Sequence, residues 1–424
     1  MIKMNQKMIG KLNILHLAIT VLCLTSAFFI NRNFVLVAFL LNVGFSFFLP
    51  RKYLSANLCF LVSFAVIYKT SADSSSLFTW LMLFTVALLM LRNFQVSVHS
   101  LATIIICIVY FIMGMLFSGK IAINEFVKQI SNLLLLAILV NSSRKGEYKT
   151  VFIYFIFGVL VSSTIALFGD KIPDLYDYLR RTTAAIGVFR FSGLNNDPNY
   201  YSVNLIFAIV LLFILYLKRD IGGLYWGIGS SIFVIFGFMT YSKSFLLMSA
   251  GVVILLMIQI IKARKNNLLM LFLLVISFAL FLLLEGKVID LKVLFNRFSN
   301  DSSDILTGRL DLWKMYLEEF ENNFTTFLFG VGIGADYLQG KGSHNIYIDF
   351  IYWFGVIGTA IWLGCISSCF KQKKHIKKRS FLNCYGLIIM LIMYCFLQGV
   401  FHYEIIFHLY LTYWIFNIDI QEKA

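Results

Sequence analysis

Two polar stretches of this otherwise apolar chain carry the side chains best suited to chemistry on a phosphate. The first, 170–199, holds Arg190 just before an apolar run, and the second, 285–345, contains Arg309 and ends at His344 and Asn345. A guanidinium can bind a phosphate through two parallel hydrogen bonds, and the pKa of histidine suits proton transfer near neutral pH. These stretches predict an anion-binding site with a proton-transfer group.

Further polar side chains complete the set of candidate residues. Lys243 occupies a very short polar turn between two apolar runs, where a lysine has either a function or a snorkelling role at a helix end. The arginines have a simpler alternative role, which is to anchor lipid head groups or to pair with neighbouring carboxylates. The substrate-binding candidates are Lys243, Arg181, Arg297, Asn199 and Asn345.

The second stretch is far longer than a turn between helices, and a loop of this length usually has a function. Its apolar residues recur at helical spacing and predict a surface helix near 309–323 that begins at Arg309. The residues of the expected apolar face are Trp313, Leu317, Phe320 and Phe324. Glycines at 330, 332 and 334 predict a tight bend before the chain returns to an apolar run.

Metal and thiol chemistry find no support in the sequence. There is no HxH, HExxH or carboxylate cluster of the kind that binds zinc. All 7 cysteines fall inside apolar runs, where they act as small packing residues. We therefore expect a site that needs no metal and no cofactor.

The elements that position these residues are membrane helices. The chain has 424 residues, of which 60% are apolar and only 13% are charged, whereas about a quarter are charged in soluble domains. Runs long enough to span a bilayer recur along the whole chain and predict an all-α polytopic bundle of about 12–14 transmembrane helices in a single domain, 1–424. The runs are 12–30, 33–49, 54–68, 77–91, 97–117, 126–140, 151–169, 200–217, 222–241, 245–261, 268–284, 346–368, 382–400 and 405–418.

Charge in the connections predicts the orientation. Lysine and arginine concentrate in alternate connections, and the positive-inside rule places these, with both termini, in the cytoplasm. Both long polar loops then lie outside. The net charge of +15 is better explained by this topology than by nucleic-acid binding.

The order of the polar segments resembles the superfamily of Wzy-type O-antigen and capsule polymerases and O-antigen ligases. Three segments carry the resemblance: Arg190-Phe191-Ser192-Gly193 with Asp197-Pro198-Asn199, then Thr307-Gly308-Arg309 with Trp313, and finally Gly330-x-Gly332-x-Gly334 with His344-Asn345. Arg297 and Gly308 also fit a spacing described for polymerase loops, whereas Arg181 and Gly193 are one residue too far apart. Lys243 stands where the family often has arginine.

The resemblance implies a glycosyltransferase of the GT-C-like class in the bacterial cytoplasmic membrane, with its active site facing outside. Its substrate would be a polyprenyl-diphosphate-linked oligosaccharide, with a flippase and a chain-length regulator as protein partners. Arg190, Lys243 and Arg309 would stabilise the diphosphate leaving group, and His344 would activate or orient the acceptor hydroxyl. Asp197 and Glu404 are alternative bases.

The sequence is compatible with three functions. The first is a polymerase that joins lipid-linked repeat units into O-antigen or capsule. The second is a ligase that transfers glycan to lipid A core or to protein. The third is a flippase, which the chain favours less because it shows no internal repeat and places its cations in outer loops.

Overall fold

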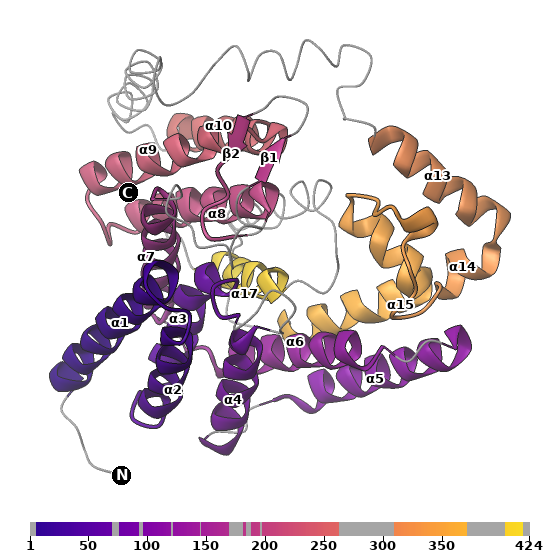
Figure 1. Cartoon of the computed structure of the whole chain (residues 1–424), viewed down its shortest axis with the longest axis horizontal. Helices are drawn as coiled ribbons and strands as arrows, with labels where there is room; N and C mark the ends of the chain where they lie inside the picture. The colour runs from indigo at the N-terminus through magenta and orange to yellow at the C-terminus, as the bar shows by residue number, and fades with distance from the viewer. Residues whose placement is uncertain are drawn as a thin grey trace. The chain divides into compact units, whose positions relative to one another are not determined.

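The computed structural model describes residues 6–69, 76–92, 96–119, 122–144, 146–168, 181–183, 188–195, 197–262, 309–370 and 403–418. The described residues are almost entirely α-helical and divide into two compact units, each built from segments distant in sequence. Unit 1 comprises residues 1–92 and 143–290, and unit 2 comprises residues 93–142 and 291–424. Figure 1 shows the helices of each unit.

The helices follow the predicted apolar runs. Those of unit 1 are α1 (Gln6–Phe29), α2 (Phe34–Ser46), α3 (Arg51–Leu61), α4 (Leu77–Arg92), α7 (Tyr148–Ala166), α8 (Pro198–Leu217), α9 (Gly223–Met239) and α10 (Lys243–Lys262). Those of unit 2 are α5 (Val98–Ser118), α6 (Ile123–Ser142), α13 (Arg309–Asn322), α14 (Phe324–Phe329), α15 (Ile346–Phe370) and α17 (Tyr403–Asn417). The predicted runs 268–284 and 382–400 lie outside the described residues.

Among the described residues, 6 helices are long and apolar enough to cross a membrane, and shorter apolar helices accompany them. This confirms the predicted fold class, an all-α polytopic membrane bundle. The run predicted as a span over 54–68 is different: α3 is an 11-residue helix continued by the 3-10 turn η1 (Val62–Phe64), and both are almost wholly buried. The first long polar loop also contains an unpredicted antiparallel hairpin of β1 (Arg181–Thr183) and β2 (Val188–Arg190).

In unit 1, α8 is the central helix. Its most apolar 18-residue segment is 89% buried, because α7, α9 and α10 all pack against it. The three helices α8, α9 and α10 follow one another in the chain and lie side by side (Figure 1). The first two turns of α8 are therefore held firmly in place.

The helices α3 and α7 cross at very short range. Gly158 of α7 makes this possible, because a Cβ atom there would lie 2.3 Å from the carbonyl oxygen of Phe60. Buried amides reinforce the contact: Asn13 donates to the hydroxyl of Tyr154, and Asn57 donates to the side-chain oxygen of Asn13 at 3.3 Å. Each such bond inside a membrane contributes about 0.6 kcal/mol.

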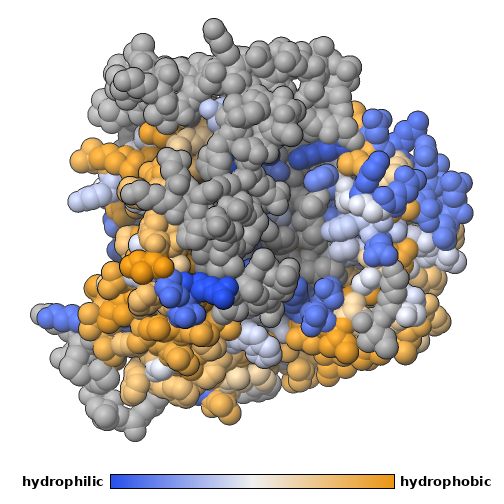
Figure 2. All heavy atoms as spheres, viewed as in Figure 1, coloured by the Kyte–Doolittle hydropathy of each residue, from blue (hydrophilic) through white to orange (hydrophobic). Residues whose placement is uncertain are grey.

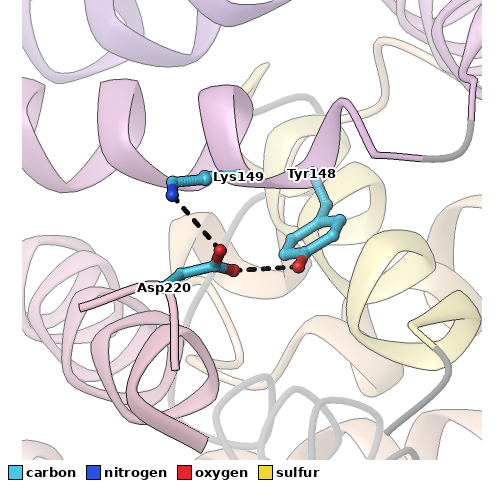
Figure 3. Close-up of polar contacts among 3 residues, drawn as sticks. All are labelled: Tyr148, Lys149 and Asp220. Carbon is cyan, nitrogen blue, oxygen red and sulfur yellow. Dashed lines mark hydrogen bonds and ion pairs between the residues drawn. The ribbon is translucent and has the colours of Figure 1, made fainter. Parts of the chain in front are cut away.

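A second tie joins the start of α7 to the turn between α8 and α9. Figure 3 shows that Asp220 accepts a hydrogen bond from the hydroxyl of Tyr148 at 2.9 Å and forms an ion pair with Lys149 at 3.2 Å. These residues lie at two connections that the charge pattern predicts to be cytoplasmic. The tie fixes α7 against α8 at the helix ends opposite to Arg190.

In unit 2, α15 packs against α5, α6, α13 and α14. Helix α13 carries mainly hydrophilic side chains, whereas α5 presents hydrophobic ones (Figure 2). Only 22% of the most apolar 18-residue segment of α5 is buried, as expected for a helix that faces lipid.

Helix α15 is broken at Gly355, where φ is 65° and ψ is 176°. Three carbonyl oxygens that precede the break have hydrogen-bond partners outside the helix. Those of Tyr352 and Trp353 accept the backbone N–H groups of Val331 and Gly332 at 2.9 and 3.0 Å, and the Tyr110 hydroxyl lies 2.7 Å from the oxygen of Phe354. Irregular backbone is tolerated in a membrane protein when protein groups satisfy it in this way.

Candidate functional site

Unit 1 brings Arg190 to the turn that carries Lys243. The Nε–H of Arg190 donates to the carbonyl oxygen of Thr240 at 3.1 Å. The backbone N–H of Phe191 donates to the carbonyl oxygen of Met239 at 3.0 Å. Residues 190 and 191 therefore lie along the end of α9. The guanidinium is half-buried and is held at the base of the turn.

The same turn is bonded to the start of α8. Ser242 donates its hydroxyl to the Oδ1 of Asn199 at 2.8 Å, and Asp197 caps α8 by accepting from the N–H of Asn199 at 2.7 Å. Lys243 is the first residue of α10 and is half-exposed. We call Arg190, Asn199, Thr240, Ser242 and Lys243 the Arg190 cluster.

The glycine of the R-x-x-G motif has a packing reason. Gly193 has φ of 60°, and a Cβ atom there would lie 2.5 Å from the ring of Tyr201. The Tyr201 hydroxyl is in turn 2.5 Å from the Oγ of Ser163 on α7. The motif therefore folds the end of β2 tightly onto α8, so that Arg190 reaches Thr240.

Unit 2 brings Arg309 and His344 onto one assembly. Arg309 begins α13, within the range where the sequence predicts a surface helix. The indole N–H of Trp313 donates to the carbonyl oxygen of Ser343 at 3.0 Å. The hydroxyl of Tyr316 donates to the carbonyl oxygen of Lys341 at 2.7 Å. We call residues 341–345 the His344 loop, and α13 fixes it on one side.

The packing face of α13 differs from the predicted one. Tyr316 and Phe320 are buried, whereas Leu317 is 53% exposed and Phe324 is 64% exposed, so only part of the predicted apolar face packs within unit 2. Tyr316 can be buried because its hydroxyl has partners, and Phe324 belongs to a separate helix, α14.

The ionisation of two tyrosines reports on the surroundings of the His344 loop. Burial, followed by the nearby carboxylate of Asp349, raises the pKa of Tyr316 well above its ordinary value of 10.0. Burial and then Asp349 raise the pKa of Tyr337 in the same direction. Both hydroxyls therefore stay neutral at physiological pH, and Tyr316 remains a hydrogen-bond donor to the loop.

The glycine segment forms the predicted bend and does more than turn the chain. Gly330, Gly332 and Gly334 have φ of 78°, 88° and 88°. A Cβ atom at Gly332 would lie 2.6 Å from the carbonyl oxygen of Gly114 on α5, and one at Gly334 would lie 2.2 Å from Ala122. The segment is therefore packed closely between α5 and the broken part of α15.

At the His344 loop, His344 is half-buried and has φ of 53°, in the left-handed region that residues other than glycine seldom adopt. Asn345 is buried, and its Oδ1 caps α15 by accepting from the N–H of Tyr347 at 3.0 Å. Sequence reasoning missed Asp349, which is wholly buried and accepts the hydroxyl of Ser343 at 2.6 Å. The feature of the sequence that could have pointed to Asp349 is the presence of a carboxylate within an apolar run.

The remaining predicted residues are less informative. Arg181 pairs with Arg190 in the backbone of the hairpin, and Arg297 lies outside the described residues. Glu404 is buried in the first turn of α17, and Asp197 serves as the cap of α8. Within the described part of the chain, His, Cys, Asp and Glu side chains form no group able to hold a metal ion.

The fold and these clusters define a polytopic helical membrane protein with cationic side chains held near helix ends. Residues 228–363 match the family model described as O-antigen ligase, which confirms the resemblance to the Wzy and O-antigen ligase superfamily. The matched range includes Lys243, Arg309 and His344, whereas Arg190 and Asn199 precede it. No curated protein and no solved structure matches the chain.

Proposed function

We propose that this protein is a glycosyltransferase that joins polyprenyl-diphosphate-linked oligosaccharide units into an O-antigen or capsule chain. It acts at the external face of the bacterial cytoplasmic membrane. The observation that carries the proposal is the pair of hydrogen bonds from Trp313 and Tyr316 to the His344 loop. They give Arg309, at the start of α13, and His344 a common rigid support.

In the proposed reaction, His344 accepts the proton of an acceptor sugar hydroxyl, whose oxygen attacks the anomeric carbon of the donor. The bond from that carbon to the polyprenyl diphosphate breaks, and negative charge develops on the leaving group. Arg309 stabilises this charge without a metal ion, and Arg190 and Lys243 are separately proposed to bind phosphate of the lipid-linked substrate. The protonated His344 then releases its proton to solvent.

Arg190 and Lys243 have distinct roles in this proposal. The bond from Nε to Thr240 fixes the plane of the Arg190 guanidinium, which favours bidentate binding to one phosphate. Lys243 adds a point charge, which places fewer demands on geometry. Asn199 and Asn345 already bond to protein groups through Oδ1, so their part in substrate binding is to hold the surrounding loops.

A second candidate is an O-antigen ligase that transfers a finished glycan to lipid A core or to protein, and the description of the matched family favours it. The ligase uses the same donor and differs in its acceptor. A flippase and a chain-length regulator would be partners of the polymerase.

An assay with the purified full-length protein and a polyprenyl-diphosphate oligosaccharide tests the proposal. A ladder of products with release of polyprenyl diphosphate is expected, and it should be lost in Arg190→Ala and Arg309→Ala. Unchanged ladders in both variants would refute the assignment of these residues. A single product formed only when lipid A core is added would identify the ligase.

The topology has its own test. Lys341 is exposed in the His344 loop, whereas the cysteines among the described residues are buried. A Lys341→Cys variant should therefore react with an impermeant maleimide in intact cells. Reaction only after permeabilisation would place the loop in the cytoplasm and overturn the proposed orientation.

A further inference from the structure

Asp349 and Ser343 form a fully buried polar pair directly beside His344. Both are 0% exposed. Oδ1 of Asp349 accepts the hydroxyl of Ser343 at 2.6 Å and also the backbone N–H of Ser343 at 3.4 Å. The N–H of Asn345 donates to the Oγ of Ser343 at 3.0 Å. These bonds fix the backbone on both sides of position 344.

Capping of α15 does not explain this carboxylate. Asn345 already caps the helix, and its carbonyl oxygen accepts the N–H of Asp349 in an ordinary helical bond at 3.0 Å. Asp349 is the only charged residue in α15. Burial of a carboxylate is costly unless hydrogen bonds compensate for lost water, so a buried Asp at this point calls for a specific role.

The role follows from the conformation of His344. A left-handed backbone is unfavourable for a side chain with a Cβ atom, and such a conformation persists only where the surroundings enforce it. The flanking residues Ser343 and Asn345 are buried, while His344 is only half-buried. The direction of the imidazole is therefore set by the backbone that Ser343 and Asp349 hold from the α15 side and Trp313 holds from the α13 side.

We propose that Asp349, acting through Ser343, is a positioning residue that holds His344 in the left-handed conformation in which its imidazole meets the acceptor hydroxyl. Asp349 does not touch the substrate and transfers no proton. The inference rests on the proposed function of His344. It assigns the buried pair to the chemical step and not to donor binding.

Steady-state kinetics of the purified full-length protein test this assignment. Ser343→Ala and Asp349→Ala should lower kcat about 10- to 100-fold, the size expected for a misplaced catalytic group, with the KM for the donor within twofold of the parent value. Asp349→Asn keeps an oxygen acceptor for Ser343 and should retain at least about a third of kcat. Ser368→Ala is the matched control, since Ser368 is a buried serine of α15 bonded to Thr103 and Cys365.

A double-mutant cycle separates positioning from general loss of structure. If the pair acts only through His344, adding Ser343→Ala to His344→Ala should leave the residual rate unchanged within twofold. A further loss of tenfold, parental rates in both alanine variants, or a raised KM at constant kcat would each overturn the inference. Full activity of His344→Ala itself would instead refute the proposed function.

Discussion

The Nε–H group of Arg190 donates to the carbonyl oxygen of Thr240, joining a hairpin to a helix end 50 residues further along the chain. This bond holds the side chain of Arg190, a candidate site residue, against the backbone close to a second candidate, Lys243. Two cations that are well separated in sequence are thereby placed in one cluster. The arrangement depends on an arginine, because lysine has no second nitrogen to present once one is engaged.

Arg190→Lys should therefore lower the rate of polyprenyl diphosphate release about 10- to 100-fold, although it preserves the charge. An ammonium group presents its three donors from a single nitrogen, so it cannot hold a planar fork toward the phosphate while it bonds to Thr240. Initial rates with the purified protein measure the effect. Arg32→Lys, an exposed arginine before α2, is the control. Equal rates for Arg190→Lys and the parent would show that only charge matters there.

His344 allows stability and activity to be separated. His344→Asn and His344→Ala should each lose activity about 100-fold or more, because neither offers a base of suitable pKa. Asparagine adopts the left-handed region readily, whereas alanine does so at a cost of about 1–2 kcal/mol. Thermal unfolding in detergent should therefore show a lower Tm for His344→Ala only. Equal Tm values would mean that φ at position 344 relaxes in the variants.

Gly355→Ala should strongly destabilise the protein. A Cβ atom there would lie 2.2 Å from the carbonyl oxygen of Leu328, and the φ and ψ values fall in a region that only glycine occupies readily. We expect a loss of about 2–6 kcal/mol from strain and overpacking together. Gly364→Ala in the same helix meets nothing within 4 Å and should be neutral or slightly stabilising.

The pH dependence of stability should report on Tyr316. Burial raises the pKa of its hydroxyl in the folded protein, so the unfolded chain ionises first as pH rises through 10.0. The stabilisation is fully present below that pH and is lost as pH approaches the folded-state value. At pH 8, Tyr316→Phe should be less stable by about 1 kcal/mol, because the bond to Lys341 is lost. Denaturation at increasing pH should show that the difference in unfolding free energy between the parent and Tyr316→Phe becomes smaller. A difference that grows with pH would contradict the expected direction.

The fold class followed from hydropathy because a bilayer imposes a minimum length on its helices. The same reasoning failed for α3, where Leu54 and Phe60 are buried within the bundle and need no such length. Apolarity alone does not distinguish a helix in contact with lipid from a short helix surrounded by other helices. The hairpin that ends at Arg190 was missed for another reason, since strands of three residues give too short a pattern.

The candidate site was less accessible to sequence reasoning than the fold. Arg190, Arg309 and His344 were identified by residue type and order, but their supports depend on contacts between distant segments. Thr240 contributes a backbone carbonyl, which has no sequence signature. Asp349 did have a signal, as a carboxylate within an apolar run, but its partner Ser343 became apparent only in three dimensions.

The break in α15 also bears on the bilayer around the protein. The part beyond Gly355, residues 356–370, measures about 22 Å at the usual rise per residue, against a hydrocarbon thickness of about 30 Å. If this part alone crosses the bilayer with the His344 loop outside, as proposed, the outer leaflet would thin beside the helix or the outer part of α15 would enter it. In both cases the phosphate level of the leaflet would approach the His344 loop. An isoprenoid substrate would then present its head group without withdrawing its tail from the membrane.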